Sequence, residues 1–214
     1  MVFELDSSLT FPDPTLAEED GWLAMGGDLS LARLMLAYRN GIFPWYSEGE
    51  PICWYSPHYR CVIFPDDVVV STSMKKILAR KTFEIRVDTA FNEVIRHCSN
   101  TLRPGQDGTW ISSDMQKAYI NLFENGFAHS VETWQDGVLV GGLYGVVVNN
   151  VFCGESMFSK INNASKAALI WLCRNRNYAI IDCQIPNAHL LSLGAVIIDR
   201  DRYMQILLAE DLSK

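Results

Sequence analysis

The pattern of apolar and polar positions changes once along the chain. In the first part glycine, proline and aromatic residues are frequent, and residues 31–39 show the spacing of a short helix, with Ser30 as its N-cap and Gly41 just beyond its end. In the second part helical and strand-like patterns follow one another regularly. The pattern therefore predicts a small, loop-rich N-terminal domain of residues 1–65 and a larger domain of residues 66–214.

The larger domain is predicted to combine helices with strands. Helical spacing marks residues 73–81, 90–98, 113–125, 164–174 and 199–208. Strand patterns mark residues 83–87, 129–134, 138–148, 151–155 and 178–184. Turn-forming residues follow the second and third of these strands, at 135–137 and 149–150, and a loop is expected at 106–108. This order predicts a mixed α+β domain with three successive antiparallel strands, similar in fold to acyltransferases of the GNAT type.

Three polar side chains fall inside two of the predicted strands: Glu155, Asp182 and Gln184. Because side chains alternate along a strand, Asp182 and Gln184 share one face, while Ile181 and Cys183 point to the other. A buried ionised group is costly unless it has partners. The arrangement therefore predicts either a polar site that a ligand completes or a buried structural network.

Each of these polar side chains has a chemical interpretation. Glu155 is expected to end its strand before a turn into a helix, where it either stabilises the helix N-terminus or binds a cation such as an amino group. Asp182 would hold the amide of Gln184 in one orientation, and that amide would orient an amine nucleophile and relay its proton. Residues 154–159 hold one glycine and a carboxylate, which disfavours a pyrophosphate-binding loop for acetyl-CoA.

The overall charge limits the partners of the chain. A formal net charge of -7 argues against indiscriminate nucleic-acid binding, so any such contact must be local. Trp45 and Trp110 lie in glycine- and proline-rich loops, where they would stack on a nucleobase or fill the core. Positive residues of one predicted helix form either a patch that contacts phosphate groups or a solvated face; they are Lys75, Lys76, Arg80 and Lys81.

Cysteine and histidine usage points away from metal and disulfide chemistry. The 6 cysteines and 4 histidines show neither a C-x-x-C pair nor zinc spacing. Cys153 and Cys183 lie in apolar strand patterns without a base beside them, so both are expected to be core residues rather than nucleophiles. No apolar run reaches the length of a membrane span and the N-terminus lacks a signal-peptide pattern, so we expect a cytoplasmic protein.

Several motifs in combination resemble those of the leucyl/phenylalanyl-tRNA protein transferase family. They are GWLAMGGDL at 21–29, AYRNGIFPW at 37–45, GTWI at 108–111, FCGESMFSKINNASK at 152–166, and DCQ at 182–184 with Asn187. The resemblance implies an enzyme that moves Leu or Phe, and in some cases Met, from aminoacyl-tRNA to the N-terminal Lys or Arg of a protein. This transfer marks the acceptor for degradation in the N-degron pathway. It also implies a small N-terminal domain packed on a GNAT-like domain, no metal and no coenzyme, and we expect a monomer.

The resemblance further assigns residues to the donor substrate. Tyr38, Trp45 and Trp110 would lie near the 3′ terminal adenosine of the tRNA. Glu155 would position the aminoacyl ester. The pocket for the transferred side chain would be lined by Tyr119, Leu143, Phe152, Met157, Leu169 and Leu172.

By the same resemblance, Asp182 and Gln184 would form the catalytic pair, with Asn187 as an adjoining polar position. Two other functions stay open on the residues alone. One is an acetyl-CoA-dependent acetyltransferase of the GNAT type. The other is a non-catalytic protein that binds tRNA or a peptide.

Overall fold

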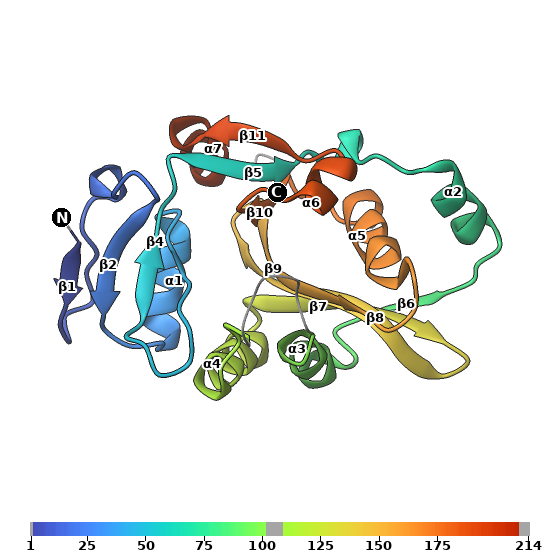
Figure 1. Ribbon diagram of the computed structural model, residues 1–214, viewed down its shortest axis with the longest axis horizontal. Coiled ribbons are helices and arrows are strands. Elements are labelled where there is room, and N and C mark those ends of the chain that lie inside the picture. Colours follow the sequence, from blue (N-terminus) through green and yellow to red (C-terminus); the bar gives the residue numbers. More distant parts are fainter. Residues whose placement is uncertain (1, 102–108, 210–214) are drawn as a thin grey trace.

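The computed structural model describes residues 2–101 and 109–209, and these residues form two sheets that lie side by side (Figure 1). The smaller sheet is built from strands near the N-terminus, and the larger one from the remainder of the chain. Strands and helices alternate through most of the larger part. The expectation of a mixed α+β protein is therefore confirmed.

The N-terminal sheet has four strands in the order β1-β2-β4-β3, in which only β1 and β2 pair in parallel among the described strands. Helix α1, Leu31–Arg39, follows β2, and Ser30 accepts a hydrogen bond from the Arg33 N–H as the expected N-cap. The strands are two to five residues long, too short to give a clear alternation in the sequence. The bounds are Phe3–Leu5 for β1, Trp22–Gly26 for β2, Phe43–Pro44 for β3, Cys53–Tyr55 for β4 and Pro14–Leu16 for the 3-10 helix η1.

The larger sheet has seven strands in the order β11-β5-β10-β9-β8-β7-β6. Strands β9 and β10 are parallel, and the other neighbours in this sheet are antiparallel. The bounds are Tyr59–Ile63 for β5, Glu84–Val87 for β6, Ala128–Gln135 for β7, Val138–Val148 for β8, Val151–Ser159 for β9, Ile180–Gln184 for β10 and Val196–Asp199 for β11. Strands β7, β8 and β9 are the three successive antiparallel strands expected from the sequence, and that expectation is confirmed.

Helices cover both faces of the larger sheet (Figure 1). Helices α3 and α4 lie on one face, while α5 lies on the other with α2 outside it, where Met74 packs against Ala167 and Ile170. The bounds are Thr72–Ala79 for α2, Phe91–Ser99 for α3, Ser113–Glu124 for α4, Ala164–Asn175 for α5, Ala188–Ser192 for α6, Arg200–Leu208 for α7 and Pro65–Asp67 for the 3-10 helix η2. In the described ranges, none of the helices is long and apolar enough to cross a bilayer.

Each helix and strand expected in the larger domain begins and ends within two residues of its expected bounds, except for one strand. The strand expected at 151–155 continues to Ser159, because the residues after Glu155 go on pairing with β8. The turn into α5 comes only at Asn163, which has a φ of 73°. Strands β5 and β11 and helix α6 were not expected, and the loop expected at 106–108 lies outside the described residues.

Strand β5 bears on the division of the chain. It precedes residue 65, yet it hydrogen-bonds to β10 and β11 of the larger sheet. The division into residues 1–65 and 66–214 stays a prediction, and a division just before Tyr59 fits the two sheets better.

A buried ion pair ties the larger sheet to the N-terminal part. Arg60, on β5, donates from Nε and Nη2 to the two carboxylate oxygens of Asp182, on β10, at 2.9 to 3.1 Å. Its Nη1 donates to the Gly41 carbonyl oxygen at 3.1 Å, and its guanidinium lies 4.7 Å from the ring centre of Phe43 and 4.5 Å from that of Tyr203. The side chains of the pair are 2% and 0% exposed, so each charge depends on the other for its stabilisation.

Arg60→Met and Asp182→Leu are each expected to lower the free energy of unfolding by about 3–5 kcal/mol, because each leaves one charge buried without its partner. The double variant should recover much of this loss, since no unpaired charge remains. Urea unfolding followed by tryptophan fluorescence measures all three. The control is Lys117→Ala, which breaks an exposed pair with Asp114 and should cost less than about 1 kcal/mol. Strictly additive losses in the double variant would contradict this account.

Candidate active site

Strand β9 carries a β-bulge at its centre. Gly145 of β8 pairs with Gly154, but the next residue back along β8, Tyr144, pairs with Ser156. Glu155 is therefore the extra residue of the bulge. The expectation that Glu155 ends its strand before a helix is wrong, because pairing with β8 carries the strand beyond it. Bulges of this kind redirect side chains and are frequent beside active sites.

A second bulge lies in the neighbouring strand β10. Its register against β5 shifts at Cys183, and Gln184 adopts a φ of 60°. The parallel pairing of β9 with β10 ends at Cys153 and Asp182. Glu155 and Gln184 thus lie where the two strands have stopped pairing, and their side chains meet there.

Glu155 is the centre of a buried polar cluster. Tyr38 of α1 donates a hydrogen bond to its Oε1 at 2.8 Å, and Tyr119 of α4 donates to its Oε2 at 3.0 Å. The side-chain amide of Gln184 donates to Oε1 at 3.0 Å. Burial raises the pKa of Glu155 to about 7, although the hydrogen bonds from the two tyrosines act to lower it. This carboxyl group therefore changes its proton state near neutral pH.

Asp182 plays a different part from the one expected. Its carboxylate accepts from Arg60, from the Tyr203 hydroxyl at 2.9 Å and from the backbone N–H of Gln184 at 2.8 Å, and it is 0% exposed. The expectation that it orients the side-chain amide of Gln184 is wrong. The left-handed backbone at Gln184 turns the main-chain N–H toward Asp182 and the amide toward Glu155. Asp182 therefore holds the backbone of Gln184, and its own carboxylate is shielded from solvent.

Most of the side chains expected to hold the transferred side chain lie together. The bulge at Glu155 shifts the alternation of β9 by one position, so that Met157 packs on the same cluster as Phe152. A cavity of about 60 Å³ touches this cluster at Phe152 and Leu172. Tyr119 belongs to a different and larger core cluster and reaches the site through its hydroxyl group. The apolar cluster contains Leu143, Phe152, Leu169 and Leu172, all at most 3% exposed, with Met157 against them.

The other residues expected at the tRNA end are more widely spread. Trp45 is 38% exposed and meets the Tyr55 ring edge-on at 5.7 Å. Trp110 is half-buried against the larger core cluster. Asn187 is exposed and caps α6 by accepting the Leu190 N–H at 2.9 Å. These contacts give Asn187 a structural role and leave the ring of Trp45 partly accessible.

The expected tRNA patch lies on and just after α2. Lys75 and Lys76 are exposed on the helix, whereas Arg80 and Lys81 are exposed beyond its end. Figure 1 shows α2 on the outer side of α5, away from α1 and α4. The structure therefore does not bring this patch next to Glu155.

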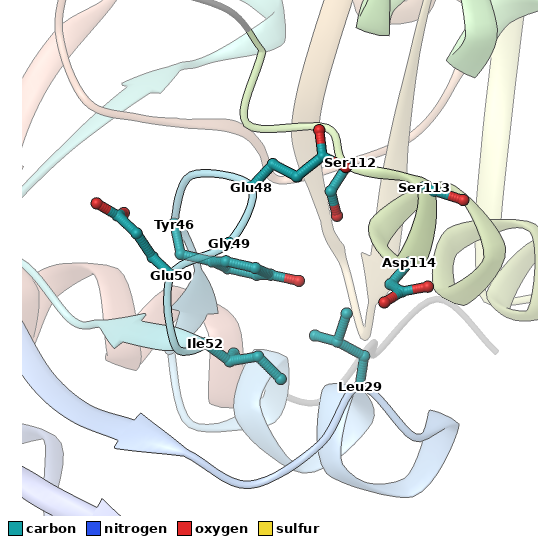
Figure 2. Close-up of a pocket in the computed structure, with 9 residues that line it drawn as sticks. All are labelled: Leu29, Tyr46, Glu48, Gly49, Glu50, Ile52, Ser112, Ser113 and Asp114. Carbon is teal, nitrogen blue, oxygen red and sulfur yellow. The ribbon is translucent and has the colours of Figure 1, made fainter.

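A separate cavity of about 530 Å³ opens between the loop after β3 and the start of α4 (Figure 2). We call it the acidic pocket, because Glu48, Glu50 and Asp114 line it beside Tyr46 and Ile52. Figure 2 shows the Tyr46 hydroxyl extending toward the start of α4, where Asp114 lies, while the Glu50 carboxylate points away. None of the residues that line it was expected to form a site.

Two residues that hold the site together were also missed. Arg60 and Tyr203 fix Asp182, and they come from β5 and α7. An arginine inside the apolar run of residues 59–63 was the available sign, because a buried guanidinium needs a carboxylate partner. Within residues 2–101 and 109–209, no three His, Cys, Asp or Glu side chains lie together as ligands for a metal ion.

Comparison with solved structures finds several distant similarities, of which two are described here. One is to a functionally unknown conserved protein from Staphylococcus epidermidis ATCC 12228, with a TM-score of 0.46, 9% identity, and coverage of 83% of this chain and 68% of that one. The other is to a ribosomal-protein-alanine N-acetyltransferase from Brucella melitensis biovar Abortus 2308, with a TM-score of 0.36, 16% identity, and coverage of 62% and 96%. Neither similarity is close enough to bear on the function.

Comparison of sequences gives a much closer match. Residues 62–208 match the family model of leucyl/phenylalanyl-tRNA protein transferase, and residues 27–58 match that of its N-terminal domain. A leucyl/phenylalanyl-tRNA–protein transferase of Flavobacterium johnsoniae is 53% identical over 96% of this chain and 99% of its own length. That of Syntrophus aciditrophicus is 51% identical over 96% of this chain and 87% of its own length. That of Pectobacterium carotovorum is 53% identical over 95% of this chain and 88% of its own length. The chain therefore belongs to the leucyl/phenylalanyl-tRNA protein transferase family.

Proposed function

We propose that this protein moves Leu or Phe, and in some cases Met, from an aminoacyl-tRNA to the N-terminal Lys or Arg of an acceptor protein, which marks the acceptor for degradation. The observation that carries the proposal is the contact between Glu155 and Gln184 at the point where β9 and β10 separate. A carboxyl group and an amide there lie next to an apolar cluster of the right chemistry for a hydrocarbon side chain. Family membership supports the same reaction.

The reaction needs an oriented amine more than a strong base. The acceptor nitrogen attacks the ester carbonyl carbon, a C–N bond forms, the ester C–O bond breaks, and the tRNA leaves with a free hydroxyl group. The proton that the amine loses balances the one that this hydroxyl gains. Since Gln184 donates its amide N–H to Glu155, its amide oxygen is directed to accept an N–H of the amine. Orientation of this kind contributes strongly to an attack on an already activated ester.

The apolar cluster would select the donor side chain. Its members are apolar side chains of β8, β9 and α5, so it would suit a hydrocarbon side chain and would give no polar partner to a hydrophilic one. One methylene group more or less changes such binding by only about 1–3 kcal/mol, so the preference among Leu, Phe and Met is modest.

The acetyltransferase alternative is less well supported. It requires a loop at a helix N-terminus that cradles pyrophosphate, whereas residues 154–159 are part of strand β9. A non-catalytic binder would not need a buried carboxyl group whose proton state changes near pH 7.

Incubation with leucyl-tRNA and a peptide that begins with Arg should yield leucylated peptide without coenzyme A. Gln184→Ala should lower kcat by at least about tenfold, because the amine loses its orienting partner. Mass spectrometry of the peptide measures both. No product from the wild-type protein refutes the proposal, and full activity of Gln184→Ala refutes the role of that residue.

The positive patch on α2 supports a contact with tRNA phosphates. Lys75→Gln with Lys76→Gln is expected to raise the apparent KM for charged tRNA more than it lowers kcat, because phosphate contacts contribute binding and not chemistry. The difference should shrink as salt is added. Equal transfer by both proteins at low and high salt would contradict this contact.

The negative charge of the acidic pocket favours an acceptor protein whose N-terminal residue is basic. Tyr119 contacts Glu155 and stands five residues after Asp114 on α4, which corresponds to about 7.5 Å along a helix. An extended Lys or Arg side chain spans a similar length. We propose that the acceptor's side chain enters this pocket while its amino group reaches Gln184.

Glu48→Gln with Asp114→Asn is expected to raise KM for a peptide that begins with Arg by about threefold to tenfold, since each exposed charge contributes up to about 1 kcal/mol. KM for leucyl-tRNA should stay the same. Glu50→Gln is the matched control, because its carboxylate points away from the pocket in Figure 2. An equal effect of the control, or no effect of the double variant, would remove the pocket from the acceptor site.

A protein that acts on charged tRNA works where translation takes place, so we propose a cytoplasmic location. A single copy of the chain supplies the polar cluster, the apolar cluster and the acidic pocket, which fits a monomer.

A further inference from the structure

The contacts among Glu155, Tyr38 and Tyr119 need more hydrogen atoms than the two tyrosine hydroxyl groups supply. The Tyr38 hydroxyl oxygen lies 2.8 Å from Glu155 Oε1, and that of Tyr119 lies 3.0 Å from Oε2. The two hydroxyl oxygens are themselves 2.5 Å apart. Each of these contacts is a hydrogen bond only if it contains a hydrogen atom, and each phenol supplies one. Two hydrogen atoms are thus available for three contacts.

A proton on Glu155 supplies the missing hydrogen atom. Protonation of the carboxyl group reverses the contact in which Tyr119 donates to the carboxylate, so that Oε2 becomes the donor and Tyr119 the acceptor. The Tyr119 hydroxyl then donates to Tyr38, and Tyr38 donates to Oε1, which closes a ring. The amide of Gln184 donates to Oε1 from outside the ring and adds no hydrogen atom to the three contacts. Burial raises the pKa of both phenols well above the usual value, so the tyrosines keep their own protons.

The surroundings of Glu155 favour the same proton state. Among residues 2–101 and 109–209, the titratable groups that face the ring carry no positive charge, and Arg60 is already paired with Asp182. In the described part of the chain, no Lys, Arg or His forms a hydrogen bond or an ion pair with Glu155. Burial raises the pKa of Glu155 to about 7. The facing groups are Tyr38 on α1, Tyr119 on α4, Tyr144 on β8, Cys153 on β9 and Asp182 on β10.

We propose that Glu155 is a carboxylic acid in the unliganded protein and that it gives up this proton when the amino group of the donor aminoacyl-tRNA binds. The second half rests on the proposed function, because it takes Glu155 to contact that amino group. When the neutral amine binds, the O–H bond of Glu155 breaks and an N–H bond forms, which leaves an ammonium beside a carboxylate at unchanged total charge. When the ammonium form binds, Glu155 releases its proton to water.

The proposal gives donor binding a distinctive dependence on pH. An α-amino group has an ordinary pKa of about 7.7–8.0. Below about pH 7 both partners are protonated and one proton must leave, whereas above about pH 8 both are deprotonated and one must be taken up. Affinity should therefore be highest between these values and fall about tenfold per pH unit on either side. A Glu155 that was ionised throughout would give an affinity independent of pH on the acid side.

The first experiment needs no substrate. Carboxyl carbon NMR of protein labelled with ¹³C at its glutamate side chains follows each proton state, and Glu155→Gln identifies the signal of Glu155. We expect this signal to titrate near pH 7 in the folded protein and near the ordinary value of about 4.3 after unfolding in urea. A signal that is fully ionised at pH 6 in the folded protein overturns the proposal.

The second experiment measures binding of two adenosine compounds by calorimetry between pH 5 and pH 9. One carries leucine in amide linkage at the 3′ position, and its control carries 4-methylpentanoate, which lacks the amino group. We expect the affinity for the leucyl compound to rise about tenfold per unit up to about pH 7, and that for the control not to rise. Affinity for the leucyl compound that is constant from pH 5 to pH 7 overturns the proton exchange. If neither compound binds, the proposed function fails, while the NMR titration still decides the proton state of Glu155.

Discussion

The buried ion pair of Arg60 and Asp182 is the interaction on which the rest of the site depends. It joins β5 to β10, and the Arg60 guanidinium reaches the N-terminal part through the Gly41 carbonyl group. The same carboxylate accepts the backbone N–H of Gln184 and so supports a residue with a φ of 60°. A non-glycine residue in this conformation costs of order 1–3 kcal/mol, and such strain persists only where its surroundings fix it. The Arg60–Asp182 pair therefore positions the Gln184 amide, because Asp182 holds the backbone N–H of the same residue.

The two bulges divide the chemistry between neighbouring strands. On β10 the bulge separates Asp182, which is fully buried and hydrogen-bonded, from Gln184, which reaches out to Glu155. On β9 the bulge places Glu155 among two tyrosines on one side and aligns Phe152 with Met157 on the other. A polar environment for amino groups and an apolar one for a side chain therefore meet at one break in the sheet. Regular alternation alone would not bring them together.

The sequence predicts the regular parts of the molecule well and the irregular parts poorly. Apolar periodicity locates most helices and strands of the larger part, because it depends only on neighbouring residues. It also groups Asp182 with Gln184, since both lie in one short strand. A bulge depends on the register between strands that are distant in sequence, so the place of Glu155 within β9 was not predictable. Arg60 and Tyr203 were missed for the same reason. Both contact the carboxylate of Asp182, which lies in a different element and more than twenty residues away in the sequence. The family resemblance named the site residues, but not which of them touch one another.

A crystal structure with the 3′-leucylamino adenosine compound bound tests the central claim most directly. That claim is that Glu155 and Gln184 face the substrate, while Asp182 acts only by holding the backbone of Gln184. We expect the leucyl amino group within hydrogen-bond distance of Glu155, the leucyl side chain beside Phe152 and Met157, and Asp182 still paired with Arg60. A ligand that contacts the Asp182 carboxylate, or one that lies away from the break between β9 and β10, would contradict it.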